Sequence, residues 1–361
     1  MTSSTKPMRI AIAGLGFGEK VILPALRDCP ETEPVALWHP RRERLEQACR
    51  VSGLPGSTEF DALLSDSQLD GLVIATPPEP RFALARAALE AGKHLLLEKP
   101  VALSCREIEE LQRLALARGL CVAVDFEYRA VPLFQQLQRL LAQGVLGELW
   151  LVKLDWLMSS RADGSRPWSW YSSKAAGGGV LGSLGTHAFD ILHWLVGPAR
   201  DLQPRLSTAI RERPLANGAR AAVDAEDIAL IQMQLQDSGG RLVPGQLSLA
   251  SVTRAGRGFS LELYGRDATL VLASTNQNDY VHGFQLWLTR GGETARRIDA
   301  DPDLAFSRTW EDGRIAPVRR LIGWWAQAAG AGRPMLPGLA EAVLSQRCCD
   351  WAAQGSAATL P

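Results

Sequence analysis

The chain has 361 residues, which is long for one ordinary hydrophobic core, so two domains are expected. Hydrophobic residues make up 46% and charged residues 22%, which is the balance of a soluble globular protein. Because 39 basic residues balance 39 acidic ones, we expect neither a nucleic-acid partner nor a membrane-surface partner. No apolar run reaches the roughly 20 residues that a membrane span needs.

The N-terminus and the cysteines bear on the compartment. The first nine residues are polar and lead directly into a strand, so no signal-peptide core is expected. The six cysteines show no CxxC spacing, which is typical of small buried side chains or free thiols in a reducing compartment. We therefore expect a cytoplasmic protein without a metal site.

A glycine-rich turn follows the first expected strand, residues 9–13. Gly14 and Gly16 have the GxG spacing that begins a dinucleotide fingerprint, in which one glycine permits the turn and the next lets the backbone approach a pyrophosphate. The third glycine of the fingerprint is missing, because Glu19 stands there and Gly18 comes one place early. Glycine-rich turns of this kind also occur without nucleotides.

The second expected strand, residues 34–38, ends at a cluster of basic side chains. An acid at this position usually holds the ribose diol of NAD, and here His39, Arg41 and Arg42 follow the strand instead. Arginines there can pair with a 2′-phosphate, which favours NADP over NAD. The alternative is that both arginines form only the exposed first turn of a helix over 41–50.

Two further strand ends carry polar residues. Short apolar runs at 73–74 and 95–97 are typical of parallel strands buried on both faces. They place Thr76, Pro77 and the sequence Glu98-Lys99-Pro100 at carboxyl ends of strands, where open α/β sheets bind their ligands. Lys99 is then either a reactive group or a solvated surface lysine.

The alternation of strands and helices stops after the apolar run 121–124. We therefore predict a dinucleotide-binding domain over residues 1–125 and a second domain over 126–361, used for substrate binding and oligomerisation. In the second domain, apolar and polar residues alternate in several segments, which predicts a largely antiparallel sheet with one face on its own helices. Trp287 and Tyr264 make the other face partly apolar, and we expect it to meet a second subunit.

A second glycine run, residues 177–185, leads into a helix that carries His187 and Asp190. Their spacing of three places both side chains on one face of that helix. A histidine on an apolar helix is usually a hydrogen-bonded core residue, but the glycine-rich entry would leave His187 near a cleft.

These motifs together resemble the glucose–fructose oxidoreductase, inositol dehydrogenase and rhizopine-catabolism (Gfo/Idh/MocA) family over nearly the whole chain. The sequence Glu98-Lys99-Pro100 after Ala91-Gly92-Lys93-His94 carries most of the resemblance, together with the glycine run that ends in His187. The resemblance implies an α/β protein with an N-terminal Rossmann-type parallel sheet. It also implies a C-terminal α+β domain with a large, mostly antiparallel open sheet, and an active site between the two.

The same resemblance implies hydride transfer between a nicotinamide and a hydroxyl or carbonyl carbon of a sugar, polyol or similar small molecule. Lys99 would polarise the substrate oxygen, His187 would exchange the proton, and Asp190 would orient His187 or hold a hydroxyl. Further substrate contacts are expected at Arg129, Trp170 and Ser183. The positions expected at the cofactor are Gly14, Gly16, Phe17, Gly18, His39, Arg41, Arg42, Thr76, Pro77, Arg81, Glu98 and Lys99.

Two positions depart from the family pattern. Ser183 stands where many family dehydrogenases carry an aspartate, so proton transfer would rest on Lys99 and His187. Arg81 replaces a common histidine and either contacts a phosphate or caps a helix. Two rival functions stay open: a nicotinamide-retaining enzyme that cleaves glycosides, and a non-catalytic nucleotide-sensing binding protein. In each case we expect a homodimer or homotetramer formed through the C-terminal sheet.

Overall fold

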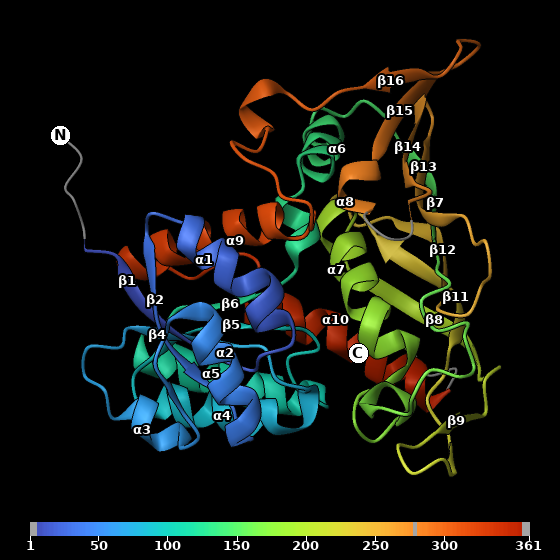
Figure 1. The fold of residues 1–361 in the computed structure, drawn as a ribbon. Helices are drawn as coiled ribbons and strands as arrows, with labels where there is room; N and C mark the ends of the chain where they lie inside the picture. Colours follow the sequence, from blue (N-terminus) through green and yellow to red (C-terminus); the bar gives the residue numbers. More distant parts are fainter. Residues whose placement is uncertain (1–5, 277–279, 356–361) are drawn as a thin grey trace. The chain divides into compact units, whose positions relative to one another are not determined.

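The computed structural model describes residues 6–276 and 280–355. The chain divides into two compact units, residues 1–130 with 308–343 and residues 131–307 with 344–361 (Figure 1). Each unit has its own sheet and its own helices. Over the described residues, no helix has both the length and the apolar character needed to cross a membrane.

The first unit is built on a six-stranded parallel sheet with the order β3-β2-β1-β4-β5-β6. This confirms the Rossmann-type sheet expected from the sequence. Its strands are β1 (Met8–Ala13), β2 (Thr32–Trp38), β3 (Gly56–Ser57), β4 (Gly71–Ile74), β5 (His94–Leu97) and β6 (Val122–Val124). Its helices are η1 (Gly18–Ile22), α1 (Leu23–Asp28), α2 (Arg42–Ser52), α3 (Phe60–Leu64), α4 (Pro78–Glu90), α5 (Cys105–Arg118), η2 (Glu127–Ala130) and α9 (Ile315–Gly330), and α10 (Leu339–Gln354) also begins in it.

Side chains of this sheet alternate between two apolar cores because successive strand residues point to opposite faces. Along β1, Ile10 and Ile12 join the core shared with α1, α2 and α9, whereas Ala11 and Ala13 join the core shared with α4 and α5. Burial on both faces explains why β4 and β5 are continuous apolar runs. Only the strand ends are left to carry polar side chains.

Local signals read from the sequence set several boundaries in this unit. Ser104 accepts a hydrogen bond from the Glu107 backbone and Glu107 returns one, which forms a capping box at the start of α5. Gly119 ends the same helix in the left-handed conformation. The helix after the glycine turn begins as the π-helical segment η1, and Pro24 lies in the first turn of α1, where its missing N–H costs little.

The second unit is built on an eight-stranded sheet with the order β16-β15-β14-β13-β7-β12-β11-β8. Only the β12–β7 pair of this sheet is parallel, so the expected mostly antiparallel sheet is confirmed. The strands of this unit are β7 (Leu149–Leu157), β8 (Ala199–Ser207), β9 (Glu212–Pro214), β10 (Arg220–Ala222), β11 (Ile228–Gln236), β12 (Leu242–Ala250), β13 (Gly258–Gly265), β14 (Ala268–Ser274), β15 (Gln285–Arg290) and β16 (Arg296–Ile298), of which β9 and β10 pair separately.

The second unit also has helices and short helical turns, several of which pack on the large sheet. They are α6 (Pro132–Ala142), η3 (Trp170–Ser172), η4 (Leu181–Gly185), α7 (Thr186–Leu195), α8 (Tyr280–Gly283) and η5 (Pro302–Leu304). Figure 1 shows α6 and α7 on the same side of the strands. On that side Val152, Leu154 and Trp156 of β7 are buried, whereas Leu151 and Lys153 on the opposite face are half-buried. The alternation in the sequence therefore separates a core face from an open one.

Candidate active site

The glycine turn after β1 has the shape that a dinucleotide requires. Gly14 has φ +99°, and a Cβ there would lie 2.6 Å from the Ala75 carbonyl, so the turn packs directly on the end of β4. At Gly16 a Cβ would meet nothing within 4 Å, which leaves open space over the backbone where a pyrophosphate would lie. A Cβ at Gly18 would come within 2.8 Å of the Ile12 side chain, so Gly18 allows the close contact between helix and strand that the fingerprint's third glycine normally provides.

Glu19 stands at the position of the missing third glycine, and its side chain forms an ion pair. The Glu19 carboxylate contacts the Arg44 guanidinium, and Arg44 also donates to the Leu15 carbonyl at 2.9 Å. Arg44 thus ties α2 to the glycine turn. Arg44 lies on a helix, several residues beyond the end of β2, so its place beside the glycine turn depends on a tertiary contact that the sequence does not state.

The basic cluster after β2 lies on the surface beside this turn. Arg41 and Arg42 are exposed, and half-buried His39 accepts a hydrogen bond at Nδ1 from the Arg41 backbone at 3.1 Å. Burial, together with the charges of Arg41 and Arg44, lowers the pKa of His39, so its ring is neutral at physiological pH. The end of β2 therefore presents guanidinium groups and a neutral imidazole.

Arg81 joins the ends of two neighbouring strands. It is 3% exposed and donates to three backbone carbonyls, those of Thr76 after β4 and of Glu98 and Pro100 after β5. These contacts turn its guanidinium inward and hold the two strand ends together. Thr76 is also buried, and its hydroxyl has no hydrogen-bond partner among the described residues, as expected of a group awaiting a ligand. Pro77, beside it, is exposed.

Three acids and Lys99 follow the ends of β5 and β6. Leu97 and Val124 are register partners, so Glu98 and Asp125 follow them side by side, and the Asp125 amide donates to the Leu97 carbonyl at 2.9 Å. Asp125 is fully buried, and no described group donates a hydrogen bond to either of its carboxyl oxygens. Glu127, two residues on, is 6% exposed. Lys99 and Glu98 are half-buried.

Burial raises the pKa of both Asp125 and Glu127. It raises the pKa of Asp125 well above its usual range, and the charges of Glu98 and Glu127 raise it further. Burial also raises the pKa of Glu127, to about 7, because the nearby charge of Lys99 offsets only part of the cost of desolvation. Strongly shifted acids beside a lysine at a strand end are typical of a functional site. The signal was present in the sequence as two acids directly after a buried strand, and its significance was missed.

The second unit holds the expected histidine in its interior. His187 is 3% exposed and Asp190 is 1% exposed in α7, and the His187 ring centroid lies 6.2 Å from that of Trp156. Ser183 belongs to η4, just before α7, and donates its hydroxyl hydrogen to the Gly179 carbonyl at 2.8 Å. The structure therefore places all three on one continuous helical segment that enters from the glycine run.

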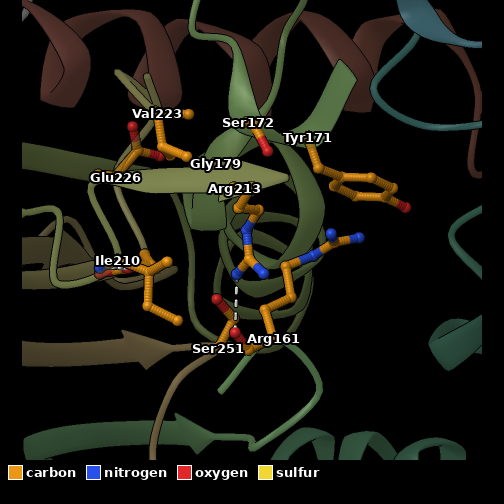
Figure 2. Close-up of a pocket in the computed structure, with 11 residues that line it drawn as sticks. Arg161, Tyr171, Ser172, Gly179, Ile210, Arg213, Val223, Glu226 and Ser251 are labelled. Carbon is orange, nitrogen blue, oxygen red and sulfur yellow. Dashed lines mark hydrogen bonds between the residues drawn. The ribbon is translucent and has the colours of Figure 1, made fainter. Parts of the chain in front are cut away.

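A small pocket of the second unit lies beside the same glycine run (Figure 2). Arg213 is 4% exposed and donates to the Arg161 and Asp163 carbonyls, both at 2.8 Å. Figure 2 shows the Arg161 side chain reaching toward the Tyr171 ring, whose centroid is 3.6 Å from the guanidinium carbon. The Trp170 ring stacks on Tyr171 with centroids 3.7 Å apart.

Comparison with known proteins decides the family. Residues 8–126 match the model described as "Oxidoreductase family, NAD-binding Rossmann fold", and residues 134–271 match the "GFO/IDH/MocA C-terminal domain". An uncharacterized oxidoreductase of Synechocystis sp. is 41% identical over 353 residues, which cover 97% of this chain and 94% of that protein. The chain belongs to the Gfo/Idh/MocA family.

More distant proteins share part of the sequence or the fold. Levoglucosan dehydrogenase of Pseudarthrobacter phenanthrenivorans is 28% identical over 248 residues, which cover 63% of this chain and 62% of that protein. A solved structure of levoglucosan dehydrogenase in complex with NADH and L-sorbose superposes with a TM-score of 0.85 at 21% identity, over 98% of this chain and 99% of the other. As a member of the Gfo/Idh/MocA family, the protein is an NAD(P)-dependent oxidoreductase with a Rossmann cofactor domain.

Proposed function

We propose that this oxidoreductase transfers a hydride between nicotinamide and a hydroxyl or carbonyl carbon of a sugar, polyol or similar small molecule. The observation that carries the proposal is Lys99, which follows β5 at the ligand-binding edge of the sheet amid buried acids. Relatives named levoglucosan dehydrogenase and D-xylose dehydrogenase support a sugar as substrate.

In this proposal, Lys99 and His187 assist the transfer of the substrate proton. The Lys99 ammonium donates to the substrate oxygen and stabilises the negative charge that develops on it. His187 exchanges a proton with the substrate, because imidazole titrates near neutral pH, and Asp190 orients it. Arg129 and Trp170 hold substrate hydroxyl groups, and the Ser183 hydroxyl makes a hydrogen bond where related enzymes use a carboxylate.

The residues of the first unit fit a nicotinamide dinucleotide. Gly14 permits the turn, Gly16 leaves open space for the pyrophosphate, and Gly18 allows the close helix contact, with Phe17 between the last two. The buried Thr76 hydroxyl offers a further hydrogen bond. Pro77 and Glu98 would line the nicotinamide end. When bound, the cofactor supplies a carbon that accepts or donates hydride.

For the adenosine end we propose a preference for NADPH over NADH. Arg41 and Arg42 are exposed after β2, where they can pair with a 2′-phosphate, and His39 stands there in place of an acid. We expect NADPH to bind more tightly in calorimetry, and Arg41→Ala to remove most of the difference. Arg50→Ala, in the last turn of the same helix, is the matched control. Equal affinities of the wild-type protein for NADH and NADPH would contradict this preference.

The test of the whole proposal is a screen of polyols, sugars and sugar phosphates, read by absorbance of the reduced cofactor. On the best substrate, Lys99→Ala should lower turnover by roughly 100-fold or more while cofactor binding persists, because a charged donor to the reacting oxygen is lost. Lys6→Ala, an exposed lysine, serves as the control.

Three results would redirect the proposal. Near-normal turnover by Lys99→Ala would reject the role of Lys99. Cofactor that co-purifies and is regenerated in each turnover would favour the glycoside-cleaving reaction. Tight cofactor binding with no turnover of any compound would favour a nucleotide-sensing protein.

We also propose that the protein forms a homodimer or homotetramer through the open face of the eight-stranded sheet. Trp287 on β15 and Val271 on β14 are register partners on that face, and Glu262 on β13 is the next residue in the row. All three are half-buried, while their neighbours along each strand point into the core. A partly apolar face of this kind suits a second copy of the sheet.

A further inference from the structure

The pocket beside the glycine run of the second unit has no role in the function proposed so far. Two of the residues that line it are arginines, Arg161 in the loop after β7 and Arg213 on β9. Figure 2 shows their side chains next to each other. Guanidinium groups repel each other at close range, so two of them in one pocket favour a partner of opposite charge.

Hydrogen bonds hold Arg161 in place. Arg213 is 4% exposed, and its Nη1 and Nη2 donate to the carbonyls of Asp163 and Arg161, both at 2.8 Å. The Arg161 amide donates to the Ser251 carbonyl, also at 2.8 Å. The guanidinium carbon of Arg161 lies 3.6 Å from the centroid of the Tyr171 ring, which covers it on one side. The loop therefore fixes the position of this guanidinium before any ligand binds.

Two acids also line the pocket, and the backbone already uses both. The Asp227 carboxylate accepts hydrogen bonds from the amides of Ala209 and Ile210 at 2.8 and 2.9 Å. The Glu226 carboxylate accepts one from the Leu181 amide at 2.9 Å. Burial raises the pKa of Glu226, which disfavours its charged form.

The protein therefore does not fully balance the positive charge of the pocket. Among the described residues, no carboxylate lies within ion-pairing distance of the Arg161 or the Arg213 guanidinium. Burial lowers the pKa of Arg161, and the charges of Arg166 and Arg213 lower it further. Because arginine keeps its proton in spite of such shifts, Arg161 is a cation with no anion beside it.

We propose that this pocket is an anion subsite of the substrate site, in which Arg161 binds a carboxylate or phosphate group of the substrate. The substrate is then a sugar acid or a sugar phosphate, and a neutral sugar is a poorer one. This inference rests on the function proposed above, in which Trp170 and Ser183 contact the substrate.

The pocket adjoins both of these proposed contacts. The Trp170 ring stacks on Tyr171, which lines the pocket, with centroids 3.7 Å apart. The Ser183 hydroxyl donates to the carbonyl of Gly179, which also lines the pocket, at 2.8 Å. A sugar ring in contact with Trp170 and Ser183 can therefore place a charged substituent beside Arg161.

The size of the pocket agrees with this role. Its volume of about 20 Å³ takes one group of the size of a water molecule, such as an oxygen of a carboxylate or phosphate. A sugar ring is too large for it and would lie outside. Guanidinium groups bind both kinds of anion through paired N–H donors.

The experiment uses sets of related substrates, each a neutral sugar with the corresponding sugar acid and sugar phosphate. In the best set, kcat/KM should be at least about 10-fold higher for an anionic member than for the neutral sugar. Arg161→Gln should raise KM for that anionic compound by about 10- to 100-fold, because a charge-assisted contact is lost. The kcat values and the KM for the neutral sugar should stay within about twofold. Arg205→Gln, at an exposed arginine on β8, is the matched control.

Calorimetry on the protein loaded with cofactor measures binding without turnover. The preferred anionic compound should bind at least about 10-fold more tightly to the wild type than to Arg161→Gln. Arg161→Lys should recover only part of this affinity, because lysine keeps the charge but not the paired N–H donors. Tighter binding of the sugar acid identifies a carboxylate as the ligand group, and tighter binding of the sugar phosphate identifies a phosphate.

The outcomes separate the subsite from the wider function. If neutral sugars are turned over and no anionic member is preferred, the subsite is wrong and the oxidoreductase proposal stands. An equal effect of Arg161→Gln on charged and neutral compounds also overturns the subsite. If Arg161→Gln does not fold, wild-type affinity of Arg161→Lys for the anionic compound overturns it equally. Binding that depends on Arg161, without turnover of any compound, would keep the subsite and reject the proposed hydride transfer.

Discussion

At the scale of single residues, the acids beside Lys99 show how a site can lower the stability of its own fold. The folded protein holds the Asp125 proton more tightly than the unfolded chain does, because burial and then the charges of Glu98 and Glu127 raise its pKa. Such a group stabilises the fold below the pKa of the unfolded chain. That stability is lost as the pH rises toward the pKa of the folded state. The cost therefore grows as the pH rises above the pKa of the unfolded chain.

Because the raised pKa of Asp125 lowers the stability of the fold at high pH, we predict the effect of Asp125→Asn, which replaces the acid by a neutral group of the same size. The variant should melt at a higher temperature than the wild type at pH 8, and the difference should shrink as the pH falls toward 4. Each kcal/mol recovered corresponds to about 2–4 °C in a domain of about 150–250 residues. Thermal unfolding from pH 4 to 8, followed by circular dichroism, measures the effect.

Asp61→Asn is the control for this experiment, because Asp61 is an exposed acid in the first turn of α3. Its pH profile should match that of the wild type. A lower melting temperature for Asp125→Asn across the whole range would show that Asp125 is charged and stabilising, contrary to the assignment made here.

At the scale of secondary-structure elements, predictions from the sequence were most successful where a local rule sets the structure. The capping box at Ser104 and the stop at Gly119 can be recognised in the sequence of α5, because both depend on backbone hydrogen bonds within a few residues. The glycine turn was also recognised, although only the structure shows that Gly18 packs against Ile12 and takes over the part of the missing glycine.

Pairing between strands could not be read in the same way. The closeness of Glu98 and Asp125 depends on the register of β5 against β6, and nothing local to either segment states that register. Arg81 shows the same limit, because its three carbonyl partners come from two strand ends that are far apart in the sequence. The sequence therefore predicted which strand ends carry polar groups, but not which of these groups meet.

At the scale of the whole molecule, the sequence showed where the alternation of strands and helices stops. The periodicity of apolar residues does not show which unit the late helices join. The first unit also takes in residues 308–343, and Trp325 of α9 is fully buried in its core. An amphipathic helix shows which of its faces is apolar, but not which sheet that face covers. Assigning a late helix to an early sheet requires tertiary contacts.

We expect the open face of the eight-stranded sheet to form the contact between subunits. Lys153 on β7 and Glu262 on β13 are register partners with their charged groups 3.7 Å apart, and Tyr264 donates to Glu262 at 2.6 Å. A patch that carries both charges beside Val271 and Trp287 can pair with a copy of itself about a twofold axis. We therefore expect a dimeric or tetrameric mass by light scattering.

Val271→Arg tests which surface makes this contact. Val271 points away from the core, so an arginine there should leave the protomer folded while placing like charges opposite each other in the dimer. The variant should be monomeric at concentrations where the wild type is not. Val51→Arg, at a valine that is 74% exposed on α2, should keep the wild-type mass. A monomeric wild type would reject the oligomer, whereas an oligomer that tolerates Val271→Arg would place the contact on another surface.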